Sequence, residues 1–329
     1  MSASGNDFAL KNRIHSTHSI SPQAPCTMAI LVTGGTGFIG QRLIPLLGKA
    51  LITSRNPSTA AGKFEGLPVD ILQWTPTNQP LTLDPDTRVD GVINLMGESI
   101  ADGRWDSAKK KRIRESRVDG TRALIDGLKI LKQPPKFFVS TSAIGYYGDC
   151  GDNILTEEAL PGKGFLSDVC VEWEQVTQEA SQLGMRVSII RVGIVLGLGG
   201  GALDGMLPIF KKGLGGRLGN GKQWISWIHI DDLVQLFHWA AVNDSVQGAF
   251  NGTAPEPVTN ATLTAELASA LRKPAVLPVP RFAVRLKFGE FADSLFESQR
   301  VSSEKACDQG FSFKYQKLND CLTDLLPSR

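Results

Sequence analysis

Three glycines near the start of the chain have the spacing of a loop that binds a phosphate. Gly34, Gly37 and Gly40 lie in the stretch TGGTGFIG, directly after the apolar run AILVT at 29–33. Glycine lets the backbone turn tightly and approach a pyrophosphate, and the N–H groups that open the next helix face that anion. Such a pattern alone is a weak signal, but here a predicted strand precedes it and a predicted helix follows it. The sequence therefore predicts a dinucleotide site at this turn.

The end of the second predicted strand indicates which dinucleotide binds. A site that prefers NAD usually has an acidic residue about 20 positions beyond the glycines, where it binds the ribose hydroxyls. No Asp or Glu occurs between Asp7 and Glu65, and the strand at 51–54 ends instead in Ser54 and Arg55. A hydroxyl and a guanidinium suit a 2′-phosphate. We therefore expect NADP(H), the alternative for Arg55 being a solvated charge at a strand end.

Hydroxyl groups follow a later strand, in the stretch FVSTSAIGYYGD at 138–149. Ser142 could hydrogen-bond a substrate oxygen, and the phenol of Tyr146 or Tyr147 could protonate a carbonyl oxygen. A phenol with no cation beside it is a poor base at neutral pH. These three are the candidate catalytic residues, and the alternative for each is packing at the end of a strand.

Strands and helices alternate along most of the chain. The predicted strands span 29–33, 51–54, 91–95, 136–140 and 186–192, and the predicted helices span 38–47, 107–131, 165–183, 230–242 and 261–271. Strands joined by helices imply a parallel sheet with helices on both faces. The expected fold class is α/β: a Rossmann-type doubly wound parallel sheet with a small, mostly helical C-terminal region on the substrate side.

Three segments follow from this pattern. Residues 1–27 are Ser-rich and contain one acidic residue, so we expect a disordered leader, an organelle transit peptide being the alternative. Residues 28–276 form the predicted NADP-binding domain, including insertions on the substrate side. Residues 277–329 form a small helical domain, whose best signal is a helix at 315–326.

Longer motifs make the chain resemble a known family. It is similar to the atypical, extended short-chain dehydrogenases, and more narrowly to the YfcH-type epimerase-family proteins with a small C-terminal domain. The motifs are GGTGFIG at 34–40, INLMGESIADGRW at 93–105, RIRESRVDGTR at 112–122, FVSTSAIGYYGD at 138–149, GGALDGMLPIFKKGLGG at 200–216 and WIHIDDL at 227–233. The resemblance covers the chain from Met28 to about Leu326.

The resemblance implies an NADP-type cofactor and a set of residues around it. The implied cofactor contacts are Thr36, Phe38, Ile39, Ser54, Arg55, Leu95, Met96, Arg117 and Val195. For Leu95 a role in the core alone is an equal alternative. Trp227 and His229, in a motif that the resemblance places at the cleft, are the candidate substrate contacts. A packed, hydrogen-bonded histidine is the alternative for His229, and we expect Asp231 to cap the helix that it opens.

The family's proton relay is missing. Short-chain dehydrogenases usually move a proton with a Tyr whose pKa is lowered by a Lys four residues later. The chain has three Tyr, and the residues four positions after them are Cys150, Gly151 and Asn319. Leu166 and Cys170 occupy the usual Tyr and Lys positions. Two functions stay open: an NADP(H)-dependent oxidoreductase or epimerase-like enzyme acting on a small carbonyl or nucleotide-sugar-like substrate, and a non-catalytic NADP(H)-binding sensor or regulatory protein.

Composition limits the partners. The 329 residues have a formal net charge of +2, which argues against a general nucleic-acid or membrane binder. The five Cys are scattered and the four His have no metal-binding spacing, so we expect no metal site and free thiols in the cytoplasm. A small-molecule substrate is the expected partner. The resemblance adds a homodimer through the helices at 107–131 and 165–183 as an option.

Overall fold

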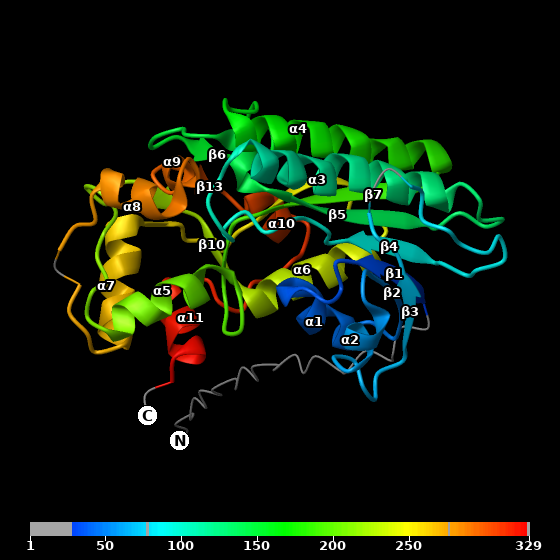
Figure 1. The fold of residues 1–329 in the computed structure, drawn as a ribbon, viewed down its shortest axis with the longest axis horizontal. Helices are drawn as coiled ribbons and strands as arrows, with labels where there is room; N and C mark the ends of the chain where they lie inside the picture. The colour runs from blue at the N-terminus through cyan, green and yellow to red at the C-terminus, as the bar shows by residue number, and fades with distance from the viewer. Residues whose placement is uncertain (1–27, 77–78, 276, 328–329) are drawn as a thin grey trace, which may run out of the picture.

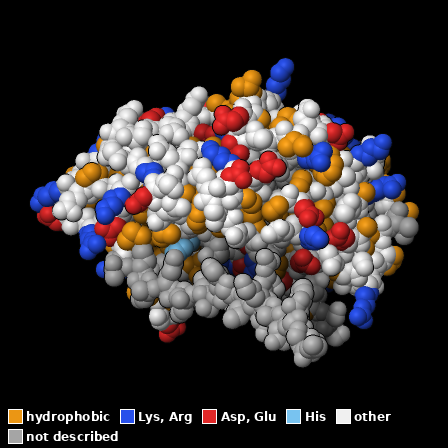
Figure 2. Space-filling model, turned by 180° about the vertical axis from the view of Figure 1, so that it is seen from behind, with side chains coloured by type: hydrophobic (Ala, Val, Ile, Leu, Met, Phe, Trp, Pro, Cys, Tyr) orange, Lys and Arg blue, Asp and Glu red, His pale blue; other side chains and the backbone are white. Residues whose placement is uncertain are grey.

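A computed structural model describes residues 28–76, 79–275 and 277–327. The expected leader, with its transit-peptide alternative, lies outside these residues. None of the helices in the described ranges is both long enough and apolar enough to cross a bilayer. Basic and acidic side chains are interspersed over the face shown in Figure 2.

A seven-stranded sheet with every pair of neighbours parallel forms the centre of the molecule (Figure 1). In sheet order the strands are β11 (Gly248–Gly252), β7 (Arg186–Val192), β5 (Phe137–Ala143), β4 (Gly91–Asn94), β1 (Ala29–Thr33), β2 (Lys49–Ser54) and β3 (Val69–Gln73). The central strands are nearly continuous apolar runs, as is typical of a sheet covered on both faces. The predicted Rossmann-type fold is confirmed.

Helices cover the two faces of this sheet (Figure 1). On one face lie α3 (Ser107–Leu128) and α4 (Phe165–Gln178), whose apolar side chains share a core with Leu31 and Phe138. On the other lie α1 (Phe38–Leu43), α2 (Pro57–Ala61) and α6 (Ile230–Val242), packed on Ile30 and Val32. Both cores are continuous with the strands, so the carboxyl ends of β1, β4 and β5 are held at one edge of the sheet.

A mostly helical region lies beyond that edge. Its apolar core joins α5 (Gly201–Lys211), α7 (Asn260–Ala270) and α11 (Leu318–Leu325). The helices α8 (Arg281–Phe288) and α9 (Phe291–Ser294) also belong to this region, whereas α10 (Glu304–Asp308) packs on β11 and joins the core of the central sheet. Short strands complete the region: β6 (Ile154–Leu155), β8 (Ile194–Leu196), β9 (Trp224–Ile225), β10 (Trp227–His229), β12 (Val258–Thr259) and β13 (Arg300–Val301). The residue boundary between the two predicted domains stays a prediction.

Several elements escape the sequence pattern, among them β3, β11, α2 and α5. β3 and β11 are the edge strands of the sheet, and their sequences VDILQ and GAFNG contain few consecutive apolar residues. α2 is a single short turn, and α5 begins inside the glycine-rich segment that the sequence indicates as a loop. The helix expected at 38–47 ends at Leu43 and continues as a 3-10 turn, Ile44–Leu46, which contains Pro45.

The close packing of α3 generates a prediction. A Cβ on Gly127 would lie 2.3 Å from the carbonyl oxygen of Leu81, whereas a Cβ on Gly205 in α5 would meet nothing within 4 Å. Gly127→Ala should therefore lower the free energy of unfolding by about 1–3 kcal/mol. Gly205→Ala, the matched control, should leave it unchanged or raise it by up to about 1 kcal/mol, because alanine favours helix. Urea denaturation measures both, and equal effects would contradict the packing argument.

Candidate active site

The glycine turn between β1 and α1 leaves no room for side chains. Gly34 has φ +68°, and a Cβ there would lie 2.5 Å from the carbonyl oxygen of Leu95, just after β4. A Cβ on Gly40 would lie 2.4 Å from the carbonyl oxygen of Gly35. The turn is closed by the Gly37 N–H, which donates to the Gly34 carbonyl at 3.0 Å. Glycine is thus needed where the turn touches the end of β4, with Leu95 and Met96 beside it.

The loop after β8 packs on the glycine turn through one aromatic ring. Cβ atoms on Gly197 and Gly200 would lie 2.7 and 2.5 Å from the ring of Phe38. Arg42 of α1 donates to the carbonyl of Leu198 in the same loop at 3.0 Å. The predicted cofactor residues Phe38, Ile39, Leu95 and Val195 are all partly buried and pack on one core. The structure therefore brings these sequence-predicted residues together.

Two basic side chains flank the end of β2. Arg55 is exposed and forms no ion pair within the described residues. Ser54 Oγ accepts from the backbone N–H of Asn56 at 3.1 Å, and Asn56 in turn caps α2. Lys63, just beyond α2, donates from Nζ to the carbonyl of Thr36 in the glycine turn at 3.1 Å. Sequence reasoning missed Lys63, because nothing in the pattern shows that the chain returns to the turn.

Arg117 of α3 lies against the loop that follows β4. Its Nη1 donates to the carbonyls of Glu98 and Ile113 at 3.0 and 3.1 Å, and a Cβ on Gly97 would lie 3.1 Å from the guanidinium carbon. Burial lowers the pKa of Arg117, although the acidic groups of Cys170 and Glu98 counteract this. The Arg117 guanidinium therefore lies beside Cys170. Burial raises the pKa of the Cys170 thiol to about 11, so the thiol is neutral.

A buried polar network surrounds Ser142. The serine hydroxyl donates to Glu174 Oε1 at 2.6 Å, and Arg191 of β7 binds both oxygens of Glu174, at 2.9 and 2.8 Å. Arg191 also donates to the hydroxyl of Tyr147 at 3.0 Å, and that hydroxyl donates to Asn251 Oδ1 at 2.6 Å. Burial alone would lower the pKa of Arg191, but its bonds to Glu174 raise it. The guanidinium is therefore permanently charged.

This network sets different surroundings for the three candidate catalytic residues. Ser142 and Tyr147 are 1% and 0% exposed, and burial raises the pKa of Tyr147 to about 12. Tyr146 is partly exposed, and its ring centre lies 3.6 Å from the Arg191 guanidinium carbon. A catalytic role for any of the three stays a prediction, and only Tyr146 is open to solvent.

Glu174, Arg191 and Asn251 are polar residues of the network that sequence reasoning missed. A signal was present for two of them. Glu174 lies eight positions after Leu166, on the face of α4 that also presents Cys170, and Arg191 is a charge inside the apolar strand RVSIIRV. No comparable signal marks Asn251, since the edge strand β11 was itself not predicted.

Trp227 and His229 lie in short strand β10, which pairs with β8. Both are buried; the indole N–H of Trp227 donates to the carbonyl of Glu256 at 3.0 Å, and His229 stacks on Tyr315, with ring centres 3.8 Å apart. His229 Nδ1 accepts from the backbone N–H of Asp231, so His229, and not Asp231, caps α6. A substrate contact by either residue stays a prediction.

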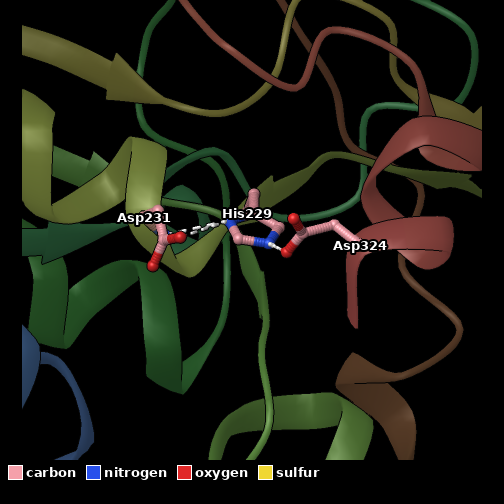
Figure 3. Close-up of side chains that lie close together, drawn as sticks. All are labelled: His229, Asp231 and Asp324. Atoms are coloured by element: carbon pink, nitrogen blue, oxygen red, sulfur yellow. Dashed lines mark hydrogen bonds and ion pairs between the residues drawn. The ribbon is translucent and has the colours of Figure 1, made fainter. Parts of the chain in front are cut away.

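The carboxylates around His229 do not converge on one point. His229, Asp231 and Asp324 have ligand atoms within 4.8 Å of one another (Figure 3). Nδ1 lies 3.9 Å from an oxygen of Asp231 and Nε2 lies 3.3 Å from an oxygen of Asp324. Nδ1 already accepts from the backbone N–H of Asp231 at 3.0 Å, so only Nε2, beside Asp324, could bind a cation. The arrangement instead fits a close polar contact between β10 and α11, and burial lowers the pKa of His229.

A pocket of about 220 Å³ opens just beyond β5. It lies between Gly145 and Leu166 on the sheet side and, on the other side, Ser294 at the end of α9 and Glu297 just after it. Aromatic rings, Lys110 and further carboxylates complete the lining. The pocket is thus located where ligands of parallel α/β sheets bind, beyond the carboxyl ends of the strands.

Comparison with known proteins identifies the family. A model of the NAD dependent epimerase/dehydratase family matches residues 30–251. The chain belongs to this family. A second model, a domain of unknown function (DUF1731), matches residues 279–325. This is therefore an NAD(P)-dependent epimerase-family protein, and the resemblance seen in the sequence motifs is confirmed.

Relatives cover nearly the whole chain. The Arabidopsis thaliana protein "Epimerase family protein SDR39U1 homolog, chloroplastic" is 38% identical over 93% of this chain and 89% of its own length. A Mycobacterium tuberculosis epimerase family protein is 36% identical over 89% of this chain and 96% of its own. Among solved structures, human epimerase family protein SDR39U1 with NADPH has a TM-score of 0.81 and 31% identity, covering 92% of this chain and 100% of that one.

The buried ion pair of this epimerase-family protein is a target for substitution. Arg191→Met would leave the largely buried Glu174 carboxylate without its cation and the Tyr147 hydroxyl without one of its two partners. The free energy of unfolding should fall by about 3–5 kcal/mol.

The matched control is Arg114→Met, which removes a more exposed ion pair between α3 and α4, Arg114 with Glu172 at 2.6 Å. That loss should be below about 1 kcal/mol. Urea denaturation followed by circular dichroism measures both. Equal losses of unfolding free energy would contradict the larger contribution expected of the buried Arg191–Glu174 pair.

Proposed function

We propose that the protein is an NADP(H)-dependent oxidoreductase or epimerase-like enzyme acting on a small carbonyl or nucleotide-sugar-like substrate. The observation that carries the proposal is the side-chain-free glycine turn with two basic residues, Arg55 and Lys63, flanking the nearby end of β2. The human relative was solved with NADPH, which supports the same cofactor here.

The residues present fit such a cofactor. The glycine turn provides backbone N–H groups at a surface without side chains, which suits a pyrophosphate. Ser54, Arg55 and Lys63 provide a hydroxyl and two cations for a 2′-phosphate. Thr36, Phe38, Ile39, Leu95, Met96 and Val195 would border the remaining parts of the nucleotide. When bound, NADPH supplies a hydride; the chain's own residues orient the substrate and move the proton.

Arg117 has a specific place in this proposal. The usual lysine position is occupied by the neutral Cys170, and the Arg117 guanidinium lies between Cys170 and Gly97 after β4. A cation beside the end of β4 would face the cofactor at the same carboxyl edge of the sheet as the glycine turn. We therefore assign Arg117 to cofactor binding, where it provides the positive charge that the missing lysine does not.

One observation favours the alternative, a non-catalytic NADP(H)-binding sensor or regulatory protein. Ser142 and Tyr147 are buried and bound to Glu174, Arg191 and Asn251, so neither hydroxyl is free to meet a substrate in this conformation. Cofactor binding alone does not distinguish the two functions, whereas turnover does. A homodimer, the absence of a nucleic-acid partner and a cytoplasmic location stay predictions. The word chloroplastic in the Arabidopsis name describes that protein.

The cofactor preference is tested by binding. NADPH should bind more tightly than NADH, and Arg55→Ala should weaken NADPH binding about tenfold with little effect on NADH, because it removes one charge-assisted hydrogen bond. Arg122→Ala, on the outer side of α3, serves as the control for loss of an arginine. Titration of reduced-cofactor fluorescence gives all the constants. A wild type that prefers NADH would contradict the proposal.

Turnover is tested with two carbonyl probes, phenanthrenequinone and a dTDP-linked keto sugar. If the enzyme function is correct, at least one probe should oxidise NADPH, seen as loss of absorbance. Ser142→Ala should slow that reaction only indirectly, because Glu174 loses the hydroxyl that donates to it. Tight NADPH binding without turnover of either probe would favour the sensor.

A further inference from the structure

The pocket beyond β5 contains one carboxyl that has no cationic partner in direct contact. Of the acidic residues that line the pocket, Glu290 is paired with Lys110, and Asp293 with Arg281 at 3.2 Å and Arg285 at 4.0 Å. Glu297 forms no ion pair within the described residues; its nearest polar contact is the amide of Gln299, at 3.5 Å. Glu297 is therefore the acidic residue of this pocket whose proton is not fixed by a bound cation.

The charges around Glu297 come from every element packed on it. Asp149, in the loop after β5, and Asp293 of α9 face it with negative charge, and Arg281 of α8 is the opposing cation. Asp149 is itself held in place, because its Oδ1 accepts from the backbone N–H of Ser298 at 3.0 Å. Burial, with the two acidic neighbours, raises the pKa of Glu297 to about 7. A carboxyl in this range can both give and take a proton at neutral pH.

The residue at the family's tyrosine position cannot donate a proton in this pocket. Leu166, at the position where the family's tyrosine would stand, lines the pocket and provides no hydroxyl. Gly145 lies against it on the same wall: a Cβ on Gly145 would be 3.4 Å from Cβ of Leu166. A small substrate that enters between these residues and α9 would meet Glu297 as an acid, whereas Ser142 and Tyr147 are closed off by the Arg191 network.

We propose that Glu297, from the C-terminal region, is the acid–base residue of this pocket and replaces the missing tyrosine of α4. The assignment rests on the proposed oxidoreductase function. In the reductive direction a hydride passes from NADPH to the carbonyl carbon, and the Glu297 carboxyl gives its proton to the carbonyl oxygen. The products are an alcohol, NADP⁺ and the Glu297 carboxylate, which regains a proton from water. In the oxidative direction the same carboxylate accepts the alcohol proton.

The pocket also indicates the substrate class. Its lining carries Lys110 and Lys163 against Glu290, Asp293 and Glu297, and Lys110 is already paired. A site with this balance is a poor match for a diphosphate and suits an uncharged carbonyl compound with hydroxyl groups, which carboxylates and aromatic rings can both contact. We therefore expect a small neutral hydroxy-carbonyl compound to react better than a nucleotide-linked sugar.

The pKa of the Glu297 carboxyl is tested first, by a measurement that needs no turnover. The NADPH-loaded protein, with ¹³C at the glutamate carboxyl, is titrated by NMR, and the resonance lost in Glu297→Gln is assigned to Glu297. Its midpoint should lie near pH 7 and should shift downward in Asp149→Asn, which removes a negative charge and keeps the oxygen that accepts from Ser298. A midpoint at the ordinary value of about 4.3 would overturn the proposal.

The pH dependence of stability gives a second measure of the pKa of Glu297. The folded pKa is raised above the unfolded value, so ionisation of Glu297 destabilises the fold as the pH rises between the two values. The melting temperature of Glu297→Gln should therefore gain on that of the wild type as the pH rises from 5 to 8. A constant difference over this range would contradict a raised pKa.

The catalytic role is tested by turnover of glyceraldehyde, phenanthrenequinone and a dTDP-linked keto sugar. Wild-type kcat should fall as the pH rises above the Glu297 midpoint. Glu297→Gln should lower kcat about 100-fold or more and remove that pH dependence. Glu297→Asp should restore part of the lost rate. Glu290→Gln, which removes a paired carboxylate from the same rim, should keep the midpoint.

The outcomes separate the two proposals. Turnover that is unchanged in rate and pH dependence by Glu297→Gln overturns the role of Glu297 and leaves the oxidoreductase function standing. A wild type that binds NADPH, titrates near pH 7 and reduces none of the three probes contradicts the oxidoreductase function and, with it, the acid–base role. A midpoint at the ordinary value with active turnover overturns the role of Glu297 alone.

Discussion

The bidentate ion pair between Arg191 and Glu174 determines how the polar groups beyond β5 are arranged. It joins β7 to α4 and, through further hydrogen bonds, fixes the Ser142 hydroxyl and the Tyr147 phenol. Two charges buried in this way are stable only if nearly all of their hydrogen-bonding capacity is used. Glu174 meets that condition by accepting from Ser142, and Arg191 by donating to Tyr147. The hydroxyl groups that a related enzyme would offer to a substrate thus satisfy the ion pair here.

A second consequence of this network concerns α4. The face of α4 toward β5 presents Leu166, Cys170 and Glu174 at intervals of four residues. The first is apolar and the second is a neutral thiol, so the only charge on that face is bound to Arg191. Positive charge near the end of β4 comes from a different helix, through Arg117 of α3. The cations at the carboxyl ends of β4 and β5, Arg117 and Arg191, therefore come from α3 and β7.

Sequence reasoning predicted the central fold well because burial dictates the pattern there. Strands β1 and β7 and helix α6 agree with the sequence to the residue, since each is an apolar run or an amphipathic repeat with clear ends. The edge strands β3 and β11 were missed because an edge strand needs fewer apolar residues. The glycine turn was recognisable since its spacing is local. The contacts of Lys63 and Asn251 were not, because each depends on chain returns that the pattern does not encode.

The C-terminal region does more than cover the apolar ends of α5 and α7. Asp324 of α11 lies against His229, and Asp232 of α6 accepts from the backbone N–H groups of Lys314 and Tyr315 at 2.8 and 2.9 Å. These bonds fix the last helix on the strand–helix unit that follows the cleft. The segment that precedes it carries α9 and therefore forms the outer wall of the pocket beyond β5. This appended segment brings Glu290, Asp293 and Glu297 to the pocket, whereas Lys110, Lys163 and Ser167 come from the preceding part of the chain. The C-terminal domain thus brings to the pocket the polar groups that α4 lacks at Leu166 and Cys170.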